Sequence, residues 1–94
     1  MEIMHDTENH KFYLIKDGQE SYAFYRMQDK DTMNIFRVYV PPEQRHQGLA
    51  AKVAKAALNY AREKNFKVIP TCSYTEYFID NNKEYKELLQ SPSP

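Results

Sequence analysis

The sequence predicts an α+β domain in which a meander of three antiparallel strands precedes a helix, a strand and C-terminal helices, in the order βββαβαα. Three observations predict it. Apolar and polar residues alternate over three stretches separated by short turns. An alanine-rich segment with helical spacing then follows a double proline, and a short apolar segment follows that helix. Chains of 94 residues rarely divide, so we expect one domain over residues 1–90 and a flexible tail over 91–94.

The three meander strands are expected at residues 10–16, 20–28 and 32–40. Asp17-Gly18 separates the first two and supplies the positive φ angles that a tight hairpin turn needs. The connections are too short for crossovers, so the strands are antiparallel. The third strand ends at Pro41-Pro42, because two prolines cannot continue a hydrogen-bonded ladder.

A long helix is expected over residues 46–64, where Leu49, Val53 and Tyr60 recur at helical spacing. Six alanines in this segment favour helix and allow close packing on a sheet. Asn65 tolerates the left-handed conformation that ends many helices.

The helix leads to a fourth strand at residues 67–72, which predicts a parallel pairing. Pro70 removes one ladder donor, so we place it at an edge or where strands splay apart. Ser73-Tyr74-Thr75-Glu76 is a capping-box sequence and predicts a helix that begins just after Cys72. A last short helix is expected over residues 83–89.

Composition narrows the class of protein. The formal net charge is zero, which argues against a general nucleic-acid or membrane-surface role. Residues 43–67 nevertheless contain six Lys or Arg against two Glu, a pattern that fits an anion site or an ordinary solvated helix face. One cysteine excludes an internal disulfide, and no membrane-spanning run is visible. We therefore expect a cytoplasmic protein, a monomer or weak dimer, with no metal site.

The junction between the third strand and the long helix reads Arg45-x-x-Gly48-x-Ala50. Unpaired backbone N–H groups and the positive end of the helix dipole face outward there. Such a turn suits a phosphate or pyrophosphate, although Gly48 also fits an ordinary helix start. Arg45 either contacts a phosphate or orders the loop. His46 is a base, a phosphate ligand or simply a solvent-exposed side chain.

This junction resembles the Gln/Arg-x-x-Gly-x-Gly/Ala signature of the GCN5-related N-acetyltransferase (GNAT) superfamily. Residues 40–50 and the segment Ile69-Pro70-Thr71-Cys72-Ser73-Tyr74 are most similar to a minimal subgroup with a Pro-x-Cys segment. The resemblance covers about residues 10–89. It implies a GNAT-like fold, acetyl-CoA as cofactor, and N-acetyltransferase activity toward a primary amine, such as a lysine of a peptide or protein.

The resemblance also implies which residues hold acetyl-CoA. In the superfamily, the loop that opens the helix binds the pyrophosphate, the preceding strand pairs with the pantetheine arm, and the following strand and helix border the thioester. The cofactor-binding residues expected here are Val38, Tyr39, Val40, Arg45, His46, Gln47, Gly48, Leu49, Ala50, Pro70, Ser73 and Tyr74. Members of the subgroup often carry a histidine where this chain has Arg37, so the acceptor is left undefined.

Cys72 and Tyr77 are the candidate catalytic residues. A helix N-terminus favours the thiolate form of a preceding cysteine. Cys72 is therefore open to three interpretations: a nucleophile that carries the acetyl group, a proton donor to the departing CoA thiolate, or a small packing residue. In many superfamily members a tyrosine in the region of Tyr74 and Tyr77 donates that proton, and packing is the other interpretation for both.

Two other functions remain open from the sequence. One is a non-catalytic module that binds acetyl-CoA or CoA. The other is a protein-interaction domain without a cofactor, which would use a sheet face rich in aromatic rings; eight tyrosines and five phenylalanines are available for such a face.

Overall fold

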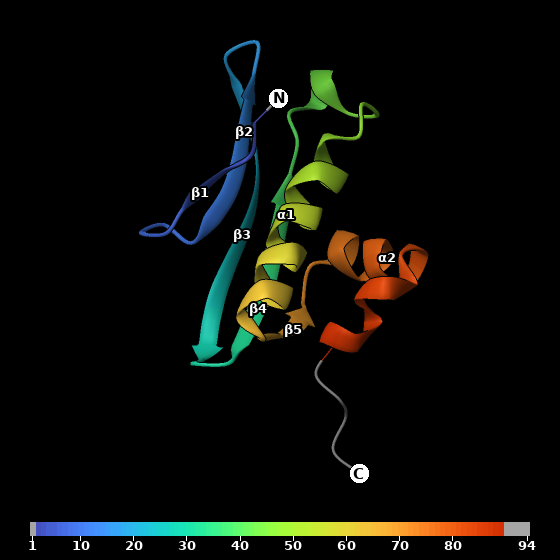
Figure 1. Ribbon diagram of the computed structural model, residues 1–94. Helices are drawn as coiled ribbons and strands as arrows, with labels where there is room; N and C mark the ends of the chain where they lie inside the picture. The colour runs from blue at the N-terminus through green and yellow to red at the C-terminus, as the bar shows by residue number, and fades with distance from the viewer. Residues whose placement is uncertain (1, 90–94) are drawn as a thin grey trace.

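The computed structural model describes residues 2–89 as a five-stranded sheet with all of its helices on one face (Figure 1). The elements in chain order are β1 Met4–Asp6, β2 Lys11–Lys16, β3 Gln19–Asp29, β4 Thr32–Tyr39, the 3-10 helix η1 Pro42–Gln44, α1 Leu49–Lys64, β5 Lys67–Pro70, α2 Ser73–Asn81 and the 3-10 helix η2 Lys83–Leu88. The sheet order is β1-β2-β3-β4-β5, antiparallel except for the parallel β4–β5 pair. The expected tail at residues 91–94 lies outside the described residues.

The predicted α+β architecture is confirmed, and the structure adds one strand to it. β1 pairs antiparallel with β2 and extends the meander to four strands. Its three residues are too few to show an alternating pattern, so the sequence does not identify them as a strand. The Asp17-Gly18 turn has the expected positive φ angles of 50° and 76°, and Asn65 ends α1 with a φ of 62°.

Two predicted boundaries shift, and one predicted cap does not form. α1 begins at Leu49 rather than residue 46, because the preceding loop includes two residues with positive φ. β5 ends at Pro70 rather than residue 72, and the N–H of Cys72 donates instead to the carbonyl of Ile35 at 3.1 Å. α2 begins at Ser73 as expected, but Cys72 is its N-cap and no side chain caps it, so the capping box does not form.

The core lies between α1 and one face of the sheet. Five residues of α1 have no exposed surface: Val53, Ala54, Ala57, Leu58 and Ala61. They pack against apolar side chains from β2, β3 and β4, and the alanines allow α1 to lie close to the strands. Phe78 and Ile79 of α2 and Tyr85 of η2 belong to the same core. All the helical segments therefore cover a single face of the sheet.

A β-bulge interrupts the pairing of β3 with β4. Phe24 pairs with Arg37 while the next residue, Tyr25, pairs with Ile35, so β4 carries the extra residue Phe36. Beyond the bulge, Val38 packs against the core.

An aromatic cluster fixes β1 against the rest of the sheet. The ring of His5 stacks on Phe12 with centroids 4.0 Å apart. It also packs against Tyr60 in a T-shaped arrangement, with centroids 4.6 Å apart. Its Nε2 lies 2.5 Å from the hydroxyl of Tyr25, a hydrogen bond. Burial lowers the pKa of His5 and raises the pKa of Tyr25 to about 12. The cluster therefore favours a neutral imidazole in the folded protein.

The lowered pKa of His5 predicts a loss of stability in mild acid. The unfolded chain takes up this proton more readily than the folded protein, so the contribution is complete above the unfolded pKa of about 6.5 and is lost as pH falls through the folded pKa. In urea denaturation, the free energy of unfolding should fall more steeply from about pH 7.5 to about pH 5.5 for the natural chain than for His5→Phe, which keeps a ring on Phe12. Identical slopes for the two proteins would contradict this assignment.

Candidate functional site

The edge strand β5 separates from β4 partway along the length of β4. β5 pairs with β4 only from Thr32 to Ile35, and the chain then turns away into α2 (Figure 1). β4 continues to Tyr39, and within residues 2–89 no strand pairs with its β5-facing edge beyond Ile35. This edge offers backbone hydrogen-bonding groups to an extended ligand, as the edge of a sheet does to an added strand.

A cavity of about 450 Å³ lies beside this edge, at the start of α1. It is bounded by the end of β4, the loop before α1, the first turn of α1, and one tyrosine of α2. The residues that line it are Val38, Tyr39, Val40, Gln44, Arg45, His46, Gly48, Leu49, Ala50, Ala51 and Tyr74. The wall thus draws on elements from both sides of the strand separation.

Two side chains fix the loop that forms one end of the cavity. Gln44 is only 5% exposed, and its Nε2 donates to the carbonyl of Lys16 at 2.8 Å. The Nε of Arg45 donates to the carbonyl of Val40 at 3.1 Å. This hydrogen bond supports the loop-ordering role expected for Arg45, and its contact with a phosphate stays a prediction.

The loop presents a row of backbone N–H groups. His46 and Gly48 have φ angles of 67° and 79°, and alternation of this kind directs neighbouring N–H groups into one concave surface. None of the N–H groups of residues 46–51 donates to a backbone acceptor within the described chain, whereas the N–H of Lys52 donates to the carbonyl of Gly48 at 3.2 Å. With the positive end of the α1 dipole, this surface is suited to an anion.

The space around Gly48 is open. A Cβ atom placed there would have no other heavy atom of the protein within 4 Å, so a ligand can approach the backbone. On the far side of Gly48, a second cavity of about 430 Å³ is lined in part by Gln47, Lys52 and Lys55. The two lysines add positive charge next to the N–H groups.

Nine of the twelve residues predicted to hold the cofactor line the first cavity. The other three, Gln47, Pro70 and Ser73, do not. The structure adds Gln44 and Ala51, which the sequence analysis did not single out. No periodicity or motif marks Gln44 as buried, because its neighbours Glu43 and Arg45 are polar and exposed.

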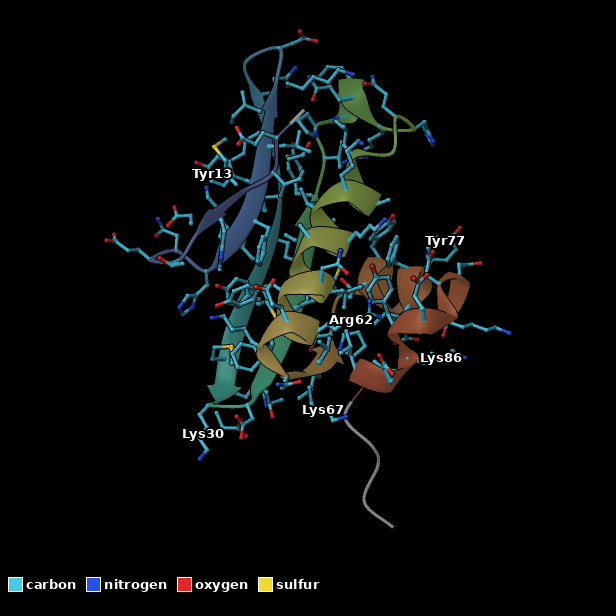
Figure 2. The ribbon with its side chains drawn as sticks, in the orientation of Figure 1. Tyr13, Lys30, Arg62, Lys67, Tyr77 and Lys86 are labelled. Carbon is cyan, nitrogen blue, oxygen red and sulfur yellow. The ribbon has the colours of Figure 1, made fainter. Side chains whose placement is uncertain are left out.

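The candidate catalytic residues lie outside the lining of this cavity. Cys72 is half-buried at the N-terminus of α2, as predicted. Tyr77 is 62% exposed and points outward from α2 (Figure 2). Tyr74, one turn earlier, lines the cavity, and its ring centroid is 6.0 Å from that of Tyr77. Burial raises the pKa of Tyr74, so its phenol, which is protonated at neutral pH even at the ordinary pKa of tyrosine, ionises less readily than that of an exposed tyrosine.

Neither a metal cluster nor a membrane span is found in the part of the chain that the structure describes. No group of three or more His, Cys, Asp or Glu in residues 2–89 could hold a metal ion. No helix in that range is long and apolar enough to cross a membrane.

The fold and the amide-rich loop correspond to a known class of protein. The family model described as GCN5-related N-acetyltransferase matches residues 11–88, and the chain belongs to this family. The resemblance seen in the sequence is thereby confirmed at the level of the family.

Individual relatives cover nearly the whole chain. Protein NATD1 of Xenopus tropicalis is 29% identical over 92 residues, which are 94% of this chain and 84% of that protein. Protein NATD1 of Homo sapiens is also 29% identical over 92 residues, 94% of this chain and 81% of that protein. The NMR solution structure of a GCN5-like protein from Staphylococcus aureus matches with a TM-score of 0.76 and 29% identity, and it covers 98% of this chain and 90% of that one.

The anchoring role of Gln44 gives a testable prediction. Gln44→Ala leaves the carbonyl of Lys16 without its donor, so it should lower the free energy of unfolding by about 1–3 kcal/mol. Gln47→Ala is the matched control: Gln47 Oε1 accepts a hydrogen bond from Nζ of Lys16, but this contact is exposed, so its loss should change stability by no more than about 0.5 kcal/mol. Chemical denaturation of both variants measures the difference. Equal losses would show that Gln44 does not anchor the loop.

Proposed function

We propose that this protein is an acetyl-CoA-dependent N-acetyltransferase that acts on a primary amine, such as a lysine of a peptide or protein. The observation that carries this proposal is the juxtaposition of two features in one cavity. One is the row of free N–H groups at residues 46–51, and the other is the unpaired edge of β4 beyond Ile35. Membership in an N-acetyltransferase family supports it.

The residues present fit acetyl-CoA. The N–H groups at the start of α1 match the oxygens of a pyrophosphate, which needs several donors and a positive potential. The end of β4 at Val38 and Tyr39, with Val40 directly after it, matches the amide groups of an extended pantetheine arm. Gly48 leaves room for the backbone to approach the phosphates. Bound in this way, acetyl-CoA would supply a thioester as the acetyl donor.

Acetyl transfer then requires few groups from the protein. The acceptor nitrogen attacks the thioester carbonyl carbon, a C–N bond forms, the C–S bond breaks with its electron pair on sulfur, and the nitrogen loses a proton to water. The protonated phenol of Tyr74 faces the cavity and is placed to donate a proton to the sulfur. We assign this role to Tyr74 in preference to Tyr77, whose side chain is largely in solvent.

The second candidate function is a module that binds acetyl-CoA or CoA without catalysing transfer. The position of Cys72 and Tyr77 favours it, because neither of these residues lines the cavity. Release of free CoA that depends on an added amine separates the two functions. An enzyme releases the thiol at a rate that rises with amine concentration, whereas a module binds the donor without consuming it.

Gly48 provides the sharpest test of the cofactor site. Gly48→Glu places a carboxylate where the pyrophosphate is expected, and charge repulsion should weaken CoA binding at least ~100-fold, measured by calorimetry. Gly48→Ala shares the strain of a φ of 79° but adds no charge. It should lose about as much stability as Gly18→Ala, whose φ is 76°. Unchanged CoA affinity in a folded Gly48→Glu variant would mean that this loop is not the phosphate site.

The role of Cys72 is tested by following the acetyl group. We propose direct attack by the amine, with Cys72 close to the thioester but not acetylated. Incubation with acetyl-CoA and no amine should then leave the protein mass unchanged. Cys72→Ala should retain CoA binding, with a slowing of up to ~10²–10⁴-fold if the thiol transfers a proton and only a few-fold if it packs. An acetyl group on Cys72 that passes to added amine at the turnover rate would establish a nucleophilic cysteine instead.

A further inference from the structure

The face of the sheet opposite α1 carries no helix within residues 2–89, and we call it the open face (Figure 1). Its side chains alternate along the strands with those that enter the core. Partly exposed rings cover it, namely Tyr13, Tyr22, Phe24, Phe36 and Tyr39. Figure 2 shows Tyr13 on the side of the sheet away from the helices.

The rings of the open face form a continuous surface. Phe24 and Phe36 lie nearly parallel, with 5° between their planes and 6.0 Å between centroids. The ring centroid of Tyr22 is 4.7 Å from that of Phe24 and 5.3 Å from that of Tyr39. Four aromatic residues from two strands are therefore held in one array by mutual contact.

Two arginines lie on this array without a carboxylate partner. The guanidinium of Arg26 is 4.7 Å from the centre of the Phe36 ring, and that of Arg37 is 5.8 Å from Tyr39. Neither forms an ion pair within the described residues, whereas Lys11 on the same face is neutralised by Glu20 at 2.7 Å. These two guanidinium groups therefore carry positive charge that no ion pair neutralises within the described residues.

The open face has a hollow of about 800 Å³ between these rings and the β1–β2 turn. Phe24, Arg26, Phe36 and Arg37 are part of its lining, and so is one carboxylate, that of Glu8 in the β1–β2 turn. The bulge places Phe36 and Arg37 directly after Ile35, the residue at which β4 and β5 separate. The hollow therefore lies on the open face and includes the two β4 residues that directly follow the β4–β5 pairing, while the candidate CoA cavity lies beside α1.

We propose that the open face binds the acceptor, and that the acceptor is an acidic polypeptide segment with a lysine among carboxylates. This inference rests on the function proposed above and names its substrate class. Unpaired guanidinium groups bind carboxylates and repel polyamines or lysine-rich tails. A broad aromatic surface suits an extended chain, whereas small molecules occupy enclosed pockets.

The same charges also assist the reaction. A nearby guanidinium lowers the pKa of an acceptor ammonium group, because it disfavours a second positive charge. A larger fraction of the acceptor is then the neutral amine, the form that attacks a thioester. Carboxylates that flank the lysine would hold it at Arg26 and Arg37 while its amine reaches the strand separation.

Two other occupants fit the open face less well. Single-stranded nucleic acid stacks on aromatic rings, but the face has only two uncompensated arginines, and exocyclic base amines are poor nucleophiles because their lone pairs are delocalised. A second copy of the chain, related by a twofold axis, would bring the same two arginines against their equivalents. Such like-charge contacts oppose association.

Binding to defined peptides tests the proposal with or without cofactor. The probe is a fluorescent peptide with one lysine flanked by two glutamates on each side; its partner has arginines in place of the glutamates, and a thymidine oligonucleotide is the third ligand. Fluorescence anisotropy should show at least about tenfold tighter binding of the glutamate peptide than of the arginine peptide. Arg26→Glu should reverse this preference, while CoA affinity measured by calorimetry stays unchanged.

Lys86→Glu is the matched control, since it makes the same change of charge on η2, on the helical side of the molecule (Figure 2). It should leave the preference for the glutamate peptide intact. Equal affinity for both peptides in the natural chain would overturn the inference without affecting the CoA site. Tighter binding of the oligonucleotide than of the glutamate peptide would also overturn it, as would a dimer in sedimentation analysis that Arg26→Glu dissociates.

Discussion

The conformation of the loop between β4 and α1 is the constraint on which the candidate site depends. Pro41 and Pro42 end the strand, since proline has no N–H to continue a ladder. Positive φ angles at His46 and Gly48 then turn the backbone so that consecutive N–H groups face outward. The conformation strains the backbone of His46 by about 1–3 kcal/mol, because the left-handed region is unfavourable for a residue with a Cβ atom. The buried amide of Gln44 helps to hold the loop in that shape.

The separation of β4 from β5 is the second requirement, and it follows from a short stretch of sequence. Pro70 is the last residue of β5 and pairs with Ile35. The N–H of Cys72 closes the pairing on the carbonyl of Ile35, and α2 begins at the next residue. Beyond this point the β5-facing edge of β4 has no strand partner within residues 2–89. The candidate CoA cavity lies beside this edge at the start of α1, and the open face lies on the opposite side of the sheet. In the proposed function, this one separation of strands would serve both the donor and the acceptor.

The sequence predicts the parts of this fold that depend on local patterns. The alternating stretches, the Asp17-Gly18 turn and the helical spacing of α1 each have a local physical cause, and the structure confirms them. β1 was not identified, because His5 is held by rings from β2, β3 and α1 that are distant in sequence. The bulge at Phe36 also depends on cross-strand register, which one strand alone does not reveal.

The candidate site also combines features that a local sequence pattern predicts with features that depend on contacts between distant residues. The residues around Gly48 could be predicted to lie together because their signature is continuous in sequence, and nine of the twelve expected residues line one cavity. Anion binding by this loop stays a prediction. The burial of Gln44 depends on a contact with Lys16 in the β2–β3 hairpin, so no local sequence pattern predicts it. The choice between Tyr74 and Tyr77 depends on how α2 is rotated against β4. Only the structure shows that Tyr74 faces the cavity and Tyr77 faces solvent.

The central claim is that the N–H groups at the start of α1 hold the phosphates of CoA. Titration of the isotopically labelled protein with CoA, followed by amide NMR, tests it most directly. We expect the largest shifts at the amides of residues 46–51, with smaller ones at residues 38–40, at and just after the end of β4. Shifts confined to the open face or to η2, or no shifts at millimolar CoA, would contradict it.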